Sequence, residues 1–101
     1  MPTFKTPIPY LEQTIDSVVN QTYPYWEFCI ADDCSDDVEI EKTLLRCEQS
    51  DNRIKVLFRK VNGHISNASN SALTLAQGDF VGLLDHDDLL APNALYEVVM
   101  L

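Results

Sequence analysis

Residues 79–88, DFVGLLDHDD, carry the most informative pattern in the chain. Its first half is apolar and rich in Val, Leu and Phe, which predicts a buried strand at Phe80 to Leu84. Three carboxylates follow at once, Asp85, Asp87 and Asp88. Carboxylates so crowded repel one another unless a positive charge lies between them. A hard divalent cation such as Mg²⁺ or Mn²⁺, completed by water and phosphate oxygens, meets that need. The end of a strand is also where ligands bind in an open α/β sheet.

Length and composition limit what the chain can be. Its 101 residues make one small domain at most, which we assign to residues 1–101. A hydrophobic content of 46% is normal for a globular protein and argues against disorder. The formal net charge of −9 excludes a general nucleic-acid surface, because such a surface needs clustered Lys and Arg.

Targeting and cysteine signals favour a cytoplasmic protein. The apolar runs are too short to span a bilayer, and no charged-then-apolar leader opens the chain. The three cysteines, Cys29, Cys34 and Cys47, show no C-x-x-C spacing. Neither a zinc site nor a disulfide framework is therefore expected, and a reducing compartment fits. We expect a cytoplasmic location, at the inner face of the membrane if a longer protein carries an attachment.

Helix and strand patterns alternate along the chain. Helices are expected at residues 10–21, from Asp36 or Asp37 to about residue 50, and at 66–77 and 93–101, and strands at 26–31, 54–58 and 80–84. Such alternation with short loops predicts an α/β fold with a parallel sheet and right-handed crossovers. Small residues in the third helix, Ala68, Ala72 and Ala76, would permit close packing on the sheet. The basic residues at 42, 46, 53, 55, 59 and 60 are interpreted as ordinary solvated charges.

Several segments resemble the family-2 glycosyltransferases, enzymes of the GT-A fold that use nucleotide-diphosphate sugars. The matching segments are residues 2–4, 6–7, 17–24, 26–35, 62–66, 68–73 and 78–88, which cover essentially the whole chain. Ser69 and His64, together with the Asp-His-Asp-Asp run, are similar to a rhamnosyltransferase-like subgroup. The resemblance implies a Rossmann-like parallel sheet with flanking helices. It also implies an incomplete domain, the N-terminal donor-binding half, with most of its first strand missing.

The resemblance also implies roles for individual residues. Pro2, Thr3 and Phe4 would flank the nucleoside of a UDP- or dTDP-linked donor, and Asp33 would hydrogen-bond its base. Asp85 and Asp87 form the family's D-x-D pattern, with Asp88 following; this segment contacts the ribose in the family and coordinates the cation that bridges the donor diphosphate. Family members transfer the sugar with inversion to a glycan or polysaccharide acceptor. Their carboxylate base comes from a later segment, so the catalytic residue of this chain is unknown and is expected beyond Leu101.

Other interpretations stay open on the residues alone. The acids at 85–88 could form a solvated loop in which Asp88 caps the next helix, and Asp32 and Asp33 could serve a cap and turn. A non-catalytic acidic α/β interaction or scaffold module could keep the pattern without using it. A nucleotidyltransferase is disfavoured, because no Gly-rich phosphate loop with basic residues appears near the start. A missing first strand would leave unpaired strand edges, which predicts self-association into a homo-oligomer.

Overall fold

The structure is a computed structural model that describes residues 1–61, 64–75, 84 and 89–99. Strands and helices alternate along it, as the sequence predicts. In chain order the elements are β1 (Pro2–Thr3), α1 (Ile8–Val19), β2 (Phe28–Asp32), α2 (Val38–Ser50), β3 (Ile54–Phe58), α3 (His64–Leu75) and α4 (Ala94–Val99). The strand expected at residues 80–84 lies outside the described residues, apart from Leu84. The helix expected at 93–101 is described from Ala94 to Val99.

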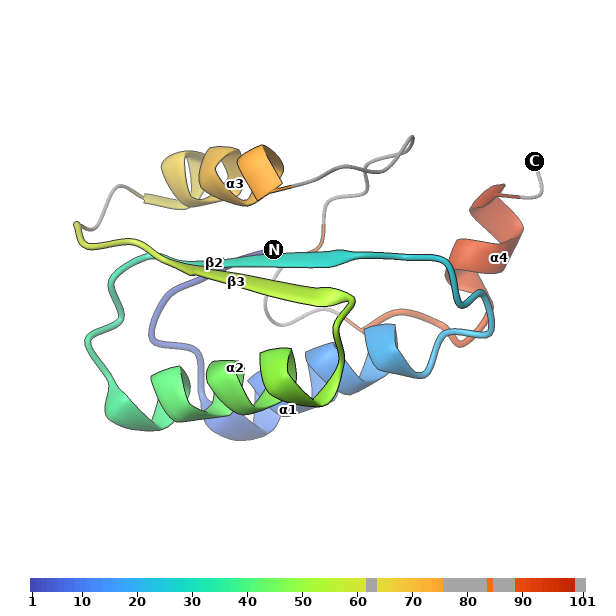
Figure 1. The fold of residues 1–101 in the computed structure, drawn as a ribbon, viewed down its shortest axis with the longest axis horizontal. Helices are drawn as coiled ribbons and strands as arrows, with labels where there is room; N and C mark the ends of the chain where they lie inside the picture. The colour runs from blue at the N-terminus through green and yellow to red at the C-terminus, as the bar shows by residue number, and fades with distance from the viewer. Residues whose placement is uncertain (62–63, 76–83, 85–88, 100–101) are drawn as a thin grey trace.

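The three described strands form one parallel sheet in the order β1-β2-β3. The register pairs Thr3 with Asp32, and Asp32 in turn with Phe58. Helices α1 and α2 cover one face of the sheet and α3 covers the other, while α4 lies near the end at which β2 and β3 begin (Figure 1). This layered arrangement places the carboxyl ends of the strands together at the opposite end of the molecule.

The two faces of the sheet are packed differently. The main core lies between the sheet and helices α1 and α2, and its buried members are Leu11, Ile15, Val18, Phe28, Ile30, Ile40, Leu44 and Ile54. On the α3 face the buried cluster is made of small side chains, Ala31, Ala68 and Ala72. Alanine at these positions lets the helix lie close to the strand, which confirms the prediction for Ala68 and Ala72.

Helix ends follow local rules that the sequence displays. Asp37 begins α2, because its Oδ1 accepts hydrogen bonds from the backbone N–H of Glu39 at 2.9 Å and of Ile40 at 3.4 Å. Helix α1 begins at Ile8, two residues before the predicted start. Pro7 and Pro9 fall at its N-cap and in its first turn, where the missing proline N–H would have no helical partner in any case.

Strand β2 begins at Phe28 rather than at the predicted Trp26, because its pairing with β3 starts where Phe28 lies opposite Ile54. The guanidinium of Arg53 lies over the indole ring, 3.7 Å from its centroid. Arg53 also makes two hydrogen bonds to Asp51, from Nε at 2.9 Å and from Nη2 at 2.7 Å, and a third to the carbonyl of Pro24. This cluster fastens the segment before β2 to the start of β3. The prediction that Arg53 and Lys55 are ordinary solvated charges is therefore wrong, because Arg53 belongs to this cluster and Lys55 pairs with Glu27 at 3.0 Å.

None of the helices in the described part of the chain is long and apolar enough to cross a membrane.

Candidate functional site

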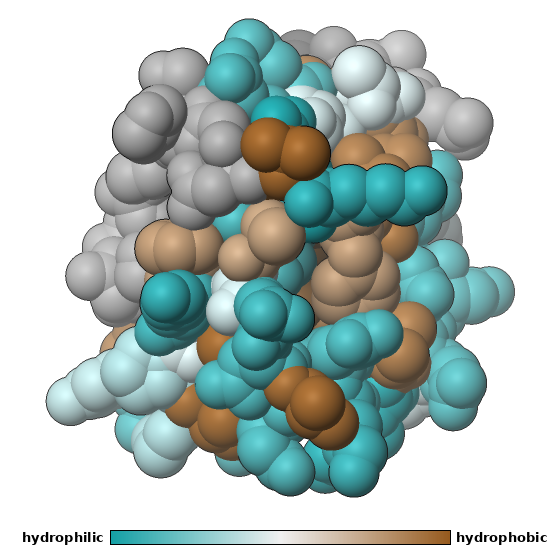
Figure 2. All heavy atoms as spheres, turned by 90° about the vertical axis from the view of Figure 1, so that its left-hand side faces the viewer, coloured by the Kyte–Doolittle hydropathy of each residue, from teal (hydrophilic) through white to brown (hydrophobic). Residues whose placement is uncertain are grey.

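The carboxyl ends of β1, β2 and β3 lie at one end of the molecule, the end that faces the viewer in Figure 2. Hydrophobic and hydrophilic residues are intermixed on this surface (Figure 2). An open pocket of about 530 Å³ lies here and is lined by Phe4, Lys5, Cys34, Ser35, Asp36 and Asp37. It is thus formed by the loops that follow β1 and β2. In an open parallel α/β sheet this is the edge at which ligands bind.

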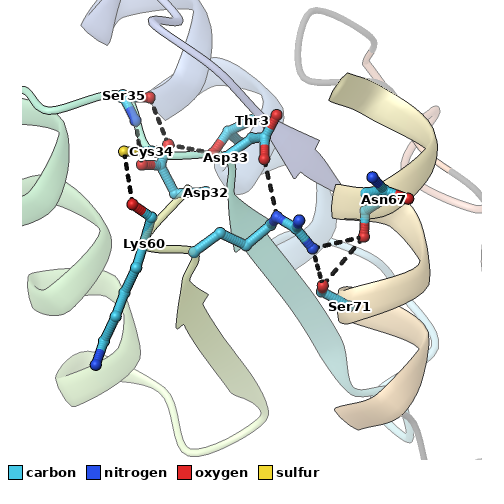
Figure 3. Close-up of polar contacts among 9 residues, drawn as sticks. Thr3, Asp32, Asp33, Cys34, Ser35, Lys60, Asn67 and Ser71 are labelled. Atoms are coloured by element: carbon cyan, nitrogen blue, oxygen red, sulfur yellow. Dashed lines mark hydrogen bonds and ion pairs between the residues drawn. The ribbon is translucent and has the colours of Figure 1, made fainter. Parts of the chain in front are cut away.

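Asp32 shapes the loop that follows β2. Its carboxylate is buried and accepts three hydrogen bonds: from Thr3 Oγ1 at 2.8 Å, from Ser35 Oγ at 2.6 Å and from the backbone N–H of Ser35 at 3.1 Å (Figure 3). Ser35 Oγ in turn accepts the backbone N–H of Lys5 at 2.8 Å. The side chains of Thr3 and Asp32 therefore hold the two loops together, and their role is architectural.

Asp33 is held differently from its neighbour. Its backbone N–H donates to the carbonyl of Thr3 at 2.8 Å, and its side chain is only 4% exposed. Arg59 Nε donates to Asp33 Oδ1 at 2.9 Å, and Arg59 Nη1 donates to the carbonyl of Asn67 at 3.0 Å and to Ser71 Oγ (Figure 3). Arg59 thereby joins the ends of β2 and β3 to helix α3.

This role of Arg59 was missed by the sequence interpretation, which treated it as a solvated charge. The side chain is 22% exposed and pairs with a buried carboxylate. The register explains the pairing: because Asp32 lies opposite Phe58, the next residues along the two strands are Asp33 and Arg59. The sequence signal for this ion pair is a basic residue directly after β3 and an acidic residue directly after the adjacent strand β2. It becomes visible only once the two strands are aligned.

The structure brings together the predicted nucleoside-binding residues that it describes. Pro2 and Thr3 form β1, Phe4 follows it, and Asp33 follows the adjacent strand. Phe4 is 39% exposed, and Lys5 Nζ lies 5.3 Å from the centroid of its ring. An exposed ring and a carboxylate therefore lie at the same edge of the sheet.

The acidic run lies outside the described residues, so the structure does not place Asp85, Asp87 or Asp88. In the part of the chain that is described, no group of three His, Cys, Asp or Glu side chains could hold a metal ion. The prediction of a metal site at the run stays a prediction.

Residues that follow the acidic run are held by the end of helix α1. Gln21 Nε2 donates to the carbonyl of Ala91 at 2.8 Å, and Gln21 Oε1 accepts the backbone N–H of Leu95 at 3.0 Å. Ser17 Oγ accepts the backbone N–H of Leu90 at 3.2 Å. We call Ser17 and Gln21 the α1 anchor. No role is predicted for either residue from the sequence, although a glutamine at the end of an amphipathic helix is a candidate for such a cap.

Comparison with known proteins gives a consistent family. The model of glycosyl transferase family 2 matches residues 1–101. The chain is 48% identical over 99 residues to the uncharacterized protein y4gI of Sinorhizobium fredii, covering 98% of this chain and 11% of that protein. It is 43% identical over 79 residues to the putative teichuronic acid biosynthesis glycosyltransferase TuaG of Bacillus subtilis, covering 78% and 31%. It is 40% identical over 85 residues to the UDP-Glc:alpha-D-GlcNAc-diphosphoundecaprenol beta-1,3-glucosyltransferase WfgD of Escherichia coli, covering 84% and 32%.

Solved structures agree with this result. The crystal structure of S. aureus TarS 1-349 superposes with a TM-score of 0.85 at 26% identity, covering 98% of this chain and 29% of that chain. The same protein in complex with UDP gives a TM-score of 0.83 at 30% identity, with the same coverage. The parallel sheet with flanking helices thus matches the GT-A, Rossmann-like fold of TarS. The chain spans 11% to 32% of the length of the relatives named above.

Proposed function

This chain belongs to glycosyl transferase family 2, and from that premise we propose that it binds the nucleotide-diphosphate sugar from which a longer protein transfers a sugar to a glycan or polysaccharide. The observation that carries the proposal is the buried Asp33 carboxylate, fixed at the carboxyl edge of the sheet beside the loop that carries Phe4. The complex of TarS with UDP supports a nucleotide ligand for this fold.

The chemistry of Asp33 favours a UDP- or dTDP-linked donor. A carboxylate only accepts hydrogen bonds, and the N3–H of uracil or thymine is a donor. Cytosine carries no hydrogen at N3, so it would place one acceptor against another. In our proposal Asp33 accepts from the base and the exposed ring of Phe4 packs on the nucleoside. Pro2 and the backbone of Thr3 would flank it, while the buried Thr3 side chain holds the loop through its hydrogen bond to Asp32. Asp85 would contact the ribose.

We further propose that Asp85, Asp87 and Asp88 bind Mg²⁺ or Mn²⁺. Carboxylate oxygens are the ligands that these hard cations prefer, so the residues present fit the ion. The α1 anchor supports the assignment, because it fixes the chain directly after the run to the end of a rigid helix. When bound, such a cation stabilises the negative charge that develops on the leaving nucleoside diphosphate. In the longer enzyme we expect transfer with inversion.

The cellular setting is part of the same proposal. The three cysteines are free thiols in the structure, and reduced cysteines are typical of proteins kept in the cytoplasm. Nucleotide-sugar donors would meet the protein there. We propose a cytoplasmic location. In this proposal the longer protein binds the acceptor, and any self-association takes place through its strand edges.

Titration calorimetry of this chain with UDP or dTDP in the presence of Mn²⁺ tests the proposal. We expect saturable binding that is lost in the Asp85→Ala/Asp87→Ala variant. A matched control is Glu12→Ala/Asp16→Ala, which removes the same number of negative charges from the exposed face of α1 and should bind UDP like the wild type. An absence of binding by the wild type would refute the donor proposal. Equal binding by the wild type and the Asp85→Ala/Asp87→Ala variant would refute the metal proposal alone.

A further inference from the structure

We propose that Arg59 is a positioning residue for base recognition, which sets the orientation of the Asp33 carboxylate and thereby the preference for uracil or thymine. This inference rests on the proposed function, because it assigns the reading of the base to Asp33. It adds a residue that lies outside the predicted nucleotide-binding set. Arg59 would act through Asp33 and need not touch the nucleotide.

The buried Asp33 carboxylate is supported by Arg59. The side chain of Asp33 is 4% exposed. A buried carboxylate needs a charged or hydrogen-bonding partner, since an uncompensated charge away from water is strongly unfavourable. Arg59 Nε supplies such a partner at 2.9 Å from Oδ1. The carboxylate therefore cannot turn without changing its contact with the guanidinium.

Arg59 is itself held at both ends of its side chain. Its backbone N–H donates to the carbonyl of Asp32 at 2.8 Å, which fixes the start of the side chain to the edge of the sheet. At the other end of the side chain, Nη1 donates to the carbonyl of Asn67 at 3.0 Å and to Ser71 Oγ. Ser71 Oγ also donates to the carbonyl of Asn67 at 3.0 Å, so the two acceptors are joined to each other.

The contacts of Arg59 with Asp33 and with α3 require the shape of an arginine side chain. The guanidinium presents its N–H donors in a rigid plane, so Nε and Nη1 can meet Asp33 and α3 at the same time. A lysine ammonium could approach Asp33 as a single charge, but its flexible stem would not fix the carboxylate against the helix. The orientation of Asp33 should therefore depend on the shape of the Arg59 side chain and not only on its charge.

The chain offers a matched control at the other end of the same strand. Arg53 precedes β3 and forms an ion pair with Asp51, its side chain being 32% exposed. Like Arg59 it is partly buried and makes several hydrogen bonds. It lies at the end of the sheet remote from the pocket. Like Arg59→Gln, the Arg53→Gln variant removes one positive charge and the hydrogen bonds of an arginine, but it leaves the contacts of Asp33 unchanged.

The experiment measures UDP and CDP binding by calorimetry with Mn²⁺ for the wild type, Asp33→Asn, Arg59→Gln, Arg59→Lys, Arg53→Gln and the Asp33→Asn/Arg59→Gln double variant. We expect Arg59→Gln to weaken UDP binding about tenfold, as for a hydrogen bond to a charged group, and to lower the preference for UDP over CDP. Arg59→Lys should fold like the wild type and still lose part of this preference. In the double variant, removal of Arg59 should add little to the effect of Asp33→Asn, while Arg53→Gln should keep the wild-type preference.

Each contrary result identifies what is wrong. Wild-type preference for UDP in both folded Arg59 variants would overturn the inference while leaving the proposed function in place. Losses that multiply in the double variant would mean that Arg59 acts independently of Asp33, which also overturns it. If the wild type binds no UDP, the proposed function falls and takes this inference with it. If Arg59→Gln fails to fold, the preference of Arg59→Lys decides the question.

Discussion

Replacing Gln21 of the α1 anchor by alanine should loosen the segment that follows the acidic run. Gln21 is 7% exposed and makes three hydrogen bonds, to the carbonyl of Ser17 at 2.9 Å, to the carbonyl of Ala91 at 2.8 Å and from the N–H of Leu95 at 3.0 Å. At about 1 kcal/mol net for each bond, the three contribute about 3 kcal/mol. Burial of a glutamine side chain costs about 1.5 kcal/mol of rotamer entropy, which alanine does not lose.

The expected net loss of stability is therefore about 1.5 kcal/mol, which for a chain of this size lowers the melting temperature by about 6–12 °C. Urea denaturation followed by circular dichroism measures the loss in free energy of unfolding. Hydrogen exchange supplies a local readout, because the amide of Leu95 should lose protection when its acceptor is removed. Gln13→Ala is the control, since Gln13 is exposed on α1, the helix that precedes Gln21.

Gln21→Glu sharpens the test. The carboxylate keeps the acceptor for Leu95 but places a negative oxygen beside the carbonyls of Ser17 and Ala91, where the amide group donated. We expect this variant to be less stable than Gln21→Ala at neutral pH and to regain stability as the pH falls, because the protonated acid can donate again. Equal stability of Gln21→Ala and Gln13→Ala, with unchanged exchange at Leu95, would refute this account of the anchor.

Two further predictions concern titration. The hydrogen bonds from Arg53 hold the pKa of the Asp51 carboxyl below its usual value. The ionised carboxylate therefore stabilises the folded state above the unfolded pKa of about 4, and this stabilisation is lost as the pH falls through the folded pKa. Asp51→Asn should therefore lower the free energy of unfolding by less than about 1 kcal/mol at pH 7 and leave it unchanged at low pH. Urea denaturation that gives the same difference between wild type and variant at both pH values would contradict this. Burial, reinforced by the charge of Glu27, raises the pKa of the Cys29 thiol, and burial likewise raises that of Cys47. Alkylation followed by mass spectrometry should show slow reaction of both thiols in the folded chain, and Glu27→Gln should speed the reaction of Cys29 alone; an equal change at Cys47 would count against this cause.

Local signals in the sequence were enough for most of the fold. The start of α2 follows from the capping side chain of Asp37, and β3 has the predicted bounds because its apolar run is short and ends at charged residues. The apolar pattern predicts a start of α1 at Tyr10, whereas the helix begins at Ile8, because Pro7 and Pro9 are compatible with an N-cap and a first helical turn. Helix α3 is described from His64 to Leu75, so it includes two residues before the predicted start at Ser66.

The positions of the candidate residues in the fold were predictable, but their contacts were not. The resemblance grouped Asp33 with Pro2, Thr3 and Phe4, and the parallel sheet brings them to one edge; their binding of a nucleotide stays a prediction. The partners Arg59 and Gln21 could not be found in the same way. Each contacts a segment far along the chain or on another strand, and such a pairing depends on the register and on helix placement, which no local pattern encodes.

The backbone of the pocket has a consequence for how the site can change. Three of the lining residues, Lys5, Cys34 and Asp36, have positive φ angles of 50°, 59° and 53°. For residues other than glycine this left-handed region costs about 1–2 kcal/mol, and β-branched side chains fit it worst. Substitutions to Val, Ile or Thr at these three positions would therefore alter the path of the loops themselves.

Two of the other lining residues are constrained by their hydrogen bonds. Ser35 joins Asp32 to the loop after β1, and Asp37 caps α2. Phe4 is the sixth lining residue, and the contact described for its side chain is with the adjacent Lys5. Among the six, position 4 can therefore vary with the least effect on the scaffold. If related chains diverge in the ligand that they accept at this pocket, we expect the divergence to begin there.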